Sequence, residues 1–92
     1  MPNLVQEAYT PIALTASALV KTGPGIVDQI IVGSGTAVTI KLWDSTTASG
    51  TVILETTAAI TPVLVLNVQA AFANGLFITI AGTAPTVTVM YQ

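Results

Sequence analysis

The stretch GSGTAVTIKLWDSTTASGTVILE, residues 33–55, decides the fold class. In its first part every second residue is apolar, namely Val38, Ile40 and Leu42. This period of two is typical of a strand that lays one face on a core. A polar loop, residues 44–50, separates this part from a second apolar run, residues 51–55. The stretch therefore predicts two strands joined by a polar loop.

Further strands are predicted on both sides of this pair, over residues 8–10, 12–22, 26–32, 63–69, 76–80 and 86–91. Turn signals separate them at Gly23-Pro-Gly, Gly33-Ser-Gly, Asn74-Gly and residues 81–85. Thr, Val and Ile supply 35 of the 92 residues, and β-branched side chains suit a pleated sheet. We therefore predict a single all-β domain over residues 1–92, an antiparallel, jelly-roll-like β-sandwich of about eight short strands.

The composition is unusually poor in charge. Only 7 % of the residues are charged, against roughly 25 % in an ordinary soluble domain, and the mean hydropathy is +0.82. Residues 56–92 carry no charge, but Pro62, Asn67 and Pro85 interrupt them, so we expect no membrane-spanning helix and no membrane partner. We instead expect the surplus apolar surface to be buried against other protein, in a homo-oligomer or a larger assembly.

Several classes of site are disfavoured by missing residue types. The chain has no cysteine, histidine or arginine, and its only basic side chains are Lys21 and Lys41. Nucleic-acid binding needs a basic face, so we expect no nucleic-acid partner. The N-terminal sequence lacks the basic region and apolar core of a secretion signal, so we expect no leader.

The carboxylates do not suggest catalysis. They are dispersed along the chain, at Glu7, Asp28, Asp44 and Glu55. General acid–base chemistry needs two such groups held close together, and nothing here can activate a hydroxyl nucleophile. Three hydroxyl residues follow Asp44, but a single carboxylate lacks the spaced acidic loop of a calcium site, which favours a polar turn. We predict no catalytic residue, no cofactor, no metal and no enzymatic activity.

Trp43 is the most informative aromatic residue, because it points to the face opposite Val38, Ile40 and Leu42. Its ring could stack on a sugar, but Trp is also enriched at protein interfaces, and an interface role is favoured. Residues 1–9 form an expected N-terminal attachment arm, because they are partly apolar and no turn signal packs them back. The expected interface residues are Leu4, Val5, Tyr9, Trp43, Ile53, Val63, Val65 and Phe77.

Three segments carry a family resemblance: ALVKTGPG (residues 18–25), VTIKLWD with ASGT (38–44 and 48–51), and FANGLFITI (72–80). They resemble small β-sandwich virion proteins of tailed bacteriophages, of the capsid decoration, cement or head-fibre type. The resemblance extends over most of residues 14–91. Head fibres usually carry a separate shaft, whereas only a short arm precedes the predicted sandwich, which favours a compact decoration protein.

The resemblance implies a non-enzymatic homo-oligomer, often a trimer. It would lie on the capsid surface of the virion and bind the major capsid protein or another virion protein. The alternative function is a carbohydrate-binding module for host adsorption, which would use Trp43 as an exposed stacking platform.

Overall fold

The computed structural model describes residues 9–92, which form six antiparallel strands. The strands are β1 (Thr10–Leu14), β2 (Ala18–Thr22), β3 (Gly25–Asp44), β4 (Thr51–Glu55), β5 (Leu64–Phe72) and β6 (Gly75–Tyr91). The all-β, antiparallel prediction is confirmed, but the structure has six strands where about eight were expected. Within the described residues there is no helix long and apolar enough to cross a bilayer.

The two long strands, β3 and β6, organise the sheet. They pair with each other, and the strand order is β1-β6-β3-β4, with β2 also on β6 and β5 also on β3. The first half of β3 pairs with β5 and its second half with β4. Likewise, the first half of β6 pairs with β2 and its second half with β1. Each short strand therefore has one neighbour and one free edge.

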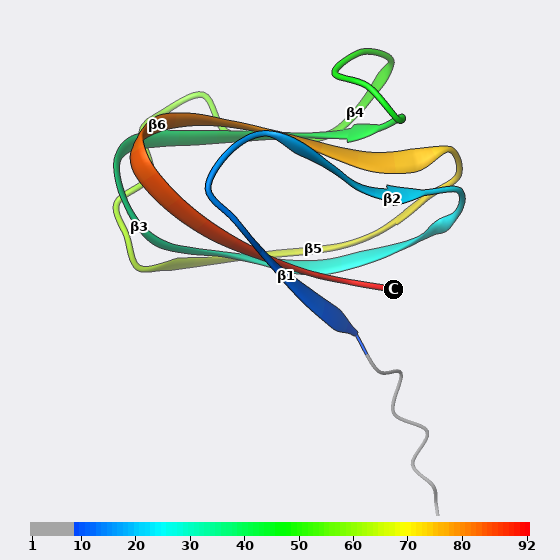
Figure 1. Cartoon of the computed structure of the whole chain (residues 1–92), viewed down its shortest axis with the longest axis horizontal. Helices are drawn as coiled ribbons and strands as arrows, with labels where there is room; N and C mark the ends of the chain where they lie inside the picture. Colours follow the sequence, from blue (N-terminus) through cyan, green and yellow to red (C-terminus); the bar gives the residue numbers. More distant parts are fainter. Residues whose placement is uncertain (1–8) are drawn as a thin grey trace, which may run out of the picture.

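Both long strands bend back on themselves at the same place (Figure 1). The bends contain Gly35 and Gly82, with φ of 125° and 124°, and the register between β3 and β6 shifts several times there. Such bulges bend a strand while pairing continues on either side. Residues 33–35 and 81–85 were predicted to be turns between separate strands. They are bends within single strands, because Thr36 still pairs with Thr83 between them.

The core takes side chains from both halves of the sheet, before and after the bends. Its buried residues are Val27, Ile30, Val32, Val38, Ile40, Leu42, Ile60, Phe72, Leu76, Ile78, Ile80, Val87 and Val89. The predicted core positions Val38, Ile40 and Leu42 are confirmed. No polar or charged residue of the described chain is buried, so the side chains of this core stabilise the fold by apolar burial.

Two residues that disturb a regular strand are accommodated by their positions, one in a bulge and one on an edge strand. Asp28 is skipped in the pairing of β3 with both β5 and β6, which confirms a bulge as one of the explanations expected for a carboxylate in this run. Pro11 lies within β1, opposite Met90. Because β1 is an edge strand, the missing N–H of Pro11 can be tolerated there.

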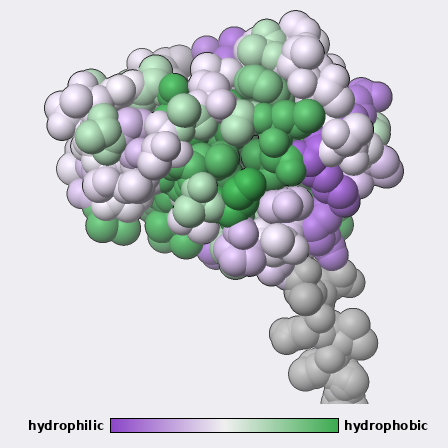
Figure 2. All heavy atoms as spheres, in the orientation of Figure 1, coloured by the Kyte–Doolittle hydropathy of each residue, from purple (hydrophilic) through white to green (hydrophobic). Residues whose placement is uncertain are grey.

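The side of the molecule that carries β1 and β2 has a broad hydrophobic area in its middle (Figure 2). These strands carry Ile12, Leu14 and Val20, which are partly buried and pack against the core. Both strands are only five residues long. Partly buried apolar side chains of these two strands therefore border the core on this side.

Candidate interaction surface

An apolar row crosses the outer face of the half of the sheet that contains β2, β6, β3 and β4. Leu19 pairs with Phe77, Phe77 with Trp43, and Trp43 with Val52. Directly paired residues project from the same face of a sheet, and the neighbouring Leu42, Leu76 and Ile78 point into the core. We call these four residues, Leu19, Phe77, Trp43 and Val52, the Trp43 row.

The Trp43 row is open to solvent at both ends. Leu19 is 42 % exposed and Val52 is 40 % exposed, while Trp43 and Phe77 in the middle are half-buried. Single exposed apolar residues are normal on a protein surface, but contiguous ones mark sites of interaction. The row is thus the apolar outer surface with the best-defined alignment in the described chain.

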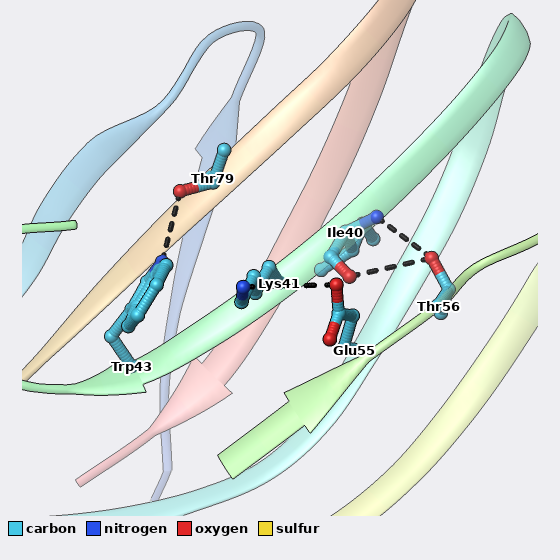
Figure 3. Close-up of polar contacts among 6 residues, drawn as sticks. All are labelled: Ile40, Lys41, Trp43, Glu55, Thr56 and Thr79. Atoms are coloured by element: carbon cyan, nitrogen blue, oxygen red, sulfur yellow. Dashed lines mark hydrogen bonds and ion pairs between the residues drawn. The ribbon is translucent and has the colours of Figure 1, made fainter. Parts of the chain in front are cut away.

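The orientation of Trp43 is fixed by two contacts within the chain (Figure 3). Its indole Nε1 donates a hydrogen bond to Thr79 Oγ1 at 3.0 Å. The Lys41 Nζ lies 4.3 Å from the ring centroid, a cation–π contact worth about 0.5 to 1 kcal/mol at exposed sites. Both the polar edge and one side of the ring are therefore engaged.

Polar contacts flank the Trp43 row and attach β4 to β3. The Lys41 Nζ lies 3.7 Å from Glu55 Oε2. The Thr56 hydroxyl accepts a hydrogen bond from Ile40 N at 2.8 Å and donates one to Ile40 O at 3.3 Å (Figure 3). These contacts extend the attachment of β4 to β3 by one residue beyond the end of the strand.

Asp44 connects the end of β3 to the turn between β5 and β6. Its carboxylate accepts hydrogen bonds from Ala73 N at 3.0 Å and from Asn74 N at 2.8 Å. The amide of Asn74 first, and then that of Ala73, lowers the pKa of Asp44 below its ordinary value of 3.8. The carboxylate considered as a calcium ligand thus binds backbone amides instead.

A second group of exposed apolar residues lies where β5 begins. Val63 is 72 % exposed, Leu64 38 % and Val65 45 %. Val65 pairs with Ile31 on the outer face, whereas Leu64 pairs with the buried Val32 on the core side. This group lies on the other half of the sheet, because β5 pairs with the first half of β3.

The predicted interface residues are distributed over both surfaces. Trp43 and Phe77 lie together in the Trp43 row, and Val63 and Val65 lie at the start of β5. Ile53 is half-buried and packs against the core, so it does not join the row. Tyr9 is half-buried just before β1, and Leu4 and Val5 lie outside the described residues, as does most of the predicted arm.

Sequence reasoning missed Leu19, Val52 and Leu64. All three are exposed apolar residues. Alternation identifies the face of Leu19 and of Leu64, but a bulge places Val52 on the outer face although Leu54, two residues later, pairs with the buried Leu42. The missing information was the register, because only the pairing of Leu19 with Phe77 and of Val52 with Trp43 joins the row.

Residues 9–92 contain no group of three or more carboxylate, histidine or cysteine side chains that could hold a metal ion. They also enclose no detectable pocket. Comparisons of the chain with protein-family models, curated proteins and solved structures found no match.

Proposed function

We infer that the chain is a non-enzymatic structural protein of a tailed-bacteriophage virion, a decoration, cement or head-fibre subunit on the capsid surface. The observation that carries this proposal is the Trp43 row, four aligned apolar side chains on an outer face of a domain with few charges. A surface of this kind suits permanent attachment to another protein. The resemblance of residues 18–25, 38–44, 48–51 and 72–80 to such virion proteins supplies the identity of that protein, a capsid or other virion protein.

The proposed architecture is a small β-sandwich whose two layers are the two halves of the bent sheet. The support is the core, which takes side chains from both halves of the sheet, together with the bends in β3 and β6 at one end (Figure 1). In this arrangement the Trp43 row belongs to the outer face of one layer and Val65 to that of the other. One layer can then face the capsid while the second remains free for other contacts.

The contacts of Trp43 favour this function over carbohydrate binding. A stacking platform needs a ring face and polar neighbours that are free to receive a sugar. Here Lys41 lies over the ring and Thr79 already accepts the indole hydrogen bond. Binding of the purified protein to a glycan array would support the carbohydrate-binding alternative, whereas a blank array agrees with a structural role.

The proposal is tested by adding the purified protein to particles of a phage whose gene for this chain has been deleted. We expect the wild-type chain to sediment with the particles and the Trp43→Ala variant to remain mostly in the supernatant. Thr79→Val is the matched control, because it removes the acceptor of the Trp43 hydrogen bond but keeps the ring. If wild-type protein does not sediment with the particles, the proposed function is wrong.

A further inference from the structure

The free edge of β5 differs from the other three free edges. β1, β2 and β4 are each five residues long, and each carries a feature that discourages further pairing: Pro11, Lys21 and Glu55, respectively. β5 is nine residues long and contains neither proline nor a charged residue. Proteins usually protect a long edge strand with such residues, because its unpaired N–H and C=O groups can pair with another strand.

The pattern of exposure at this edge indicates what would cover it. Val65 and Leu64 are consecutive, so their side chains lie on opposite faces of the sheet. Both are more than one-third exposed, although Leu64 pairs with the buried Val32 on the core side. A partner docked on the outer face would cover Val65 but not Leu64. A strand added alongside β5 would bring side chains next to both.

We propose that a second copy of this chain pairs with this edge, with β5 running antiparallel to β5 across a two-fold axis. The edges of β1, β2 and β4 carry residues that discourage pairing with another strand. The edge of the second copy that is best suited to pair is therefore its own β5. Two uncharged strands do not repel each other, and an isologous contact closes after two copies. This inference rests on the homo-oligomer expected from the charge-poor composition, but not on attachment to a virion.

The regular part of the strand limits the register of this contact. Residues 64–67 pair with β3 without a shift, whereas Gln69 has a φ of 49° beside a register shift. Pairing centred on Val65 keeps residues of the same face opposite each other and sets Leu64 opposite Leu66 of the second copy. Val65 then lies directly opposite its own counterpart. The trimer implied by the family resemblance would instead need a contact between two different surfaces.

The experiment measures the mass of the purified full-length protein by sedimentation velocity over a range of concentrations. We expect a dimer whose dissociation constant rises about tenfold or more in Val65→Lys, because two like charges would face each other across the axis. Ala13→Lys is the matched control, since Ala13 is also exposed on an edge strand, β1, and lies outside the Trp43 row. It should leave the dimer unchanged.

A cysteine variant tests the register of the β5–β5 contact. It does not depend on whether the fold tolerates a lysine at position 65. The natural chain has no cysteine, so Val65→Cys introduces one thiol. Directly opposed residues in antiparallel strands lie close enough for a disulfide, so mild oxidation should crosslink Val65→Cys but not Ala13→Cys. A monomeric or trimeric wild type would overturn the proposal. So would a dimer that Val65→Lys and Ala13→Lys weaken equally, or equal crosslinking of the two cysteine variants.

Discussion

Gly35 and Gly82 adopt nearly the same backbone conformation, with φ of 125° and 124°, at the two bends where β3 and β6 fold back together. Each begins the same three-residue sequence, Gly-Thr-Ala, whose alanines, Ala37 and Ala84, also have positive φ. The central threonines, Thr36 and Thr83, pair with each other. The same sequence and backbone conformation thus occur twice, and these two segments form the bent end of the sheet.

Substitution of Gly82 by alanine should destabilise the fold strongly. A Cβ there would lie 2.9 Å from the carbonyl oxygens of Thr36 and Ala37, in a backbone conformation that side chains rarely adopt. We expect Gly82→Ala to lower the free energy of unfolding by about 2 to 4 kcal/mol in chemical denaturation. Gly33→Ala is the control, because its nearest contact would be an ordinary 3.6 Å, and it should cost less than about 1 kcal/mol. Equal losses of unfolding free energy in Gly82→Ala and Gly33→Ala would show that the bend does not require glycine at position 82.

Asp44 should make the stability of the protein sensitive to acid. Its pKa is lowered in the folded state by the amides of Asn74 and Ala73, so its contribution is fully present above the ordinary pKa of 3.8. That contribution is lost as the pH falls through the lowered pKa. We expect Asp44→Asn to be less stable at neutral pH and to show a flatter pH dependence below 3.8. Glu55→Gln, with Asp44 intact, should keep the acid dependence; loss of the dependence in Glu55→Gln instead would contradict this assignment.

Truncation of Trp43 should weaken attachment more than it weakens the fold. The ring lies in the middle of the Trp43 row, and central aromatic residues contribute most to binding. We expect Trp43→Ala to reduce affinity for particles by about 2 kcal/mol or more, roughly 30-fold. Circular dichroism should show that the variant remains folded. Unchanged affinity in a folded Trp43→Ala variant would place the attachment surface elsewhere.

Assembly should survive high salt. The ion pair between Lys41 and Glu55 is exposed, and such pairs contribute about 1 kcal/mol at most. Apolar contacts and backbone hydrogen bonds are little screened, even at molar salt, where the Debye length is about 3 Å. Sedimentation at low and molar salt should give the same association constant within a few-fold. Dissociation into monomers by salt alone would contradict an apolar interface.

Removal of residues 1–6 should affect attachment rather than folding. β1 begins at Thr10, and its pairing with β6 does not involve the deleted residues. An attachment arm must gain contacts from a neighbour, because ordering costs about 1 to 2 kcal/mol per residue. We expect nearly unchanged thermal unfolding but weaker sedimentation with particles. Much earlier unfolding, with normal binding by the folded fraction, would instead make these residues part of the domain.

The sequence alone predicted the local features well. The alternation of Val38, Ile40 and Leu42 correctly identified the core face, and the signal at Gly23-Pro-Gly correctly marked the turn before β3. These features depend on neighbouring residues only, so they can be read from a short window.

Features that depend on pairing between distant segments could not be predicted. Thr36 and Thr83 pair across the bends, and this keeps β3 and β6 continuous where glycines indicated turns. Asp44 lies about thirty residues before the amides that it binds. The Trp43 row requires the register of four strands at once, which strand alternation does not specify.

The central claim, that the chain is a structural part of a virion, is tested most directly by quantitative mass spectrometry of purified phage particles. The particles should come from the phage that encodes the chain and should be washed at molar salt. We predict that the chain remains with the particles in a fixed ratio to the major capsid protein. Its absence from washed particles that retain their other structural proteins would contradict the claim.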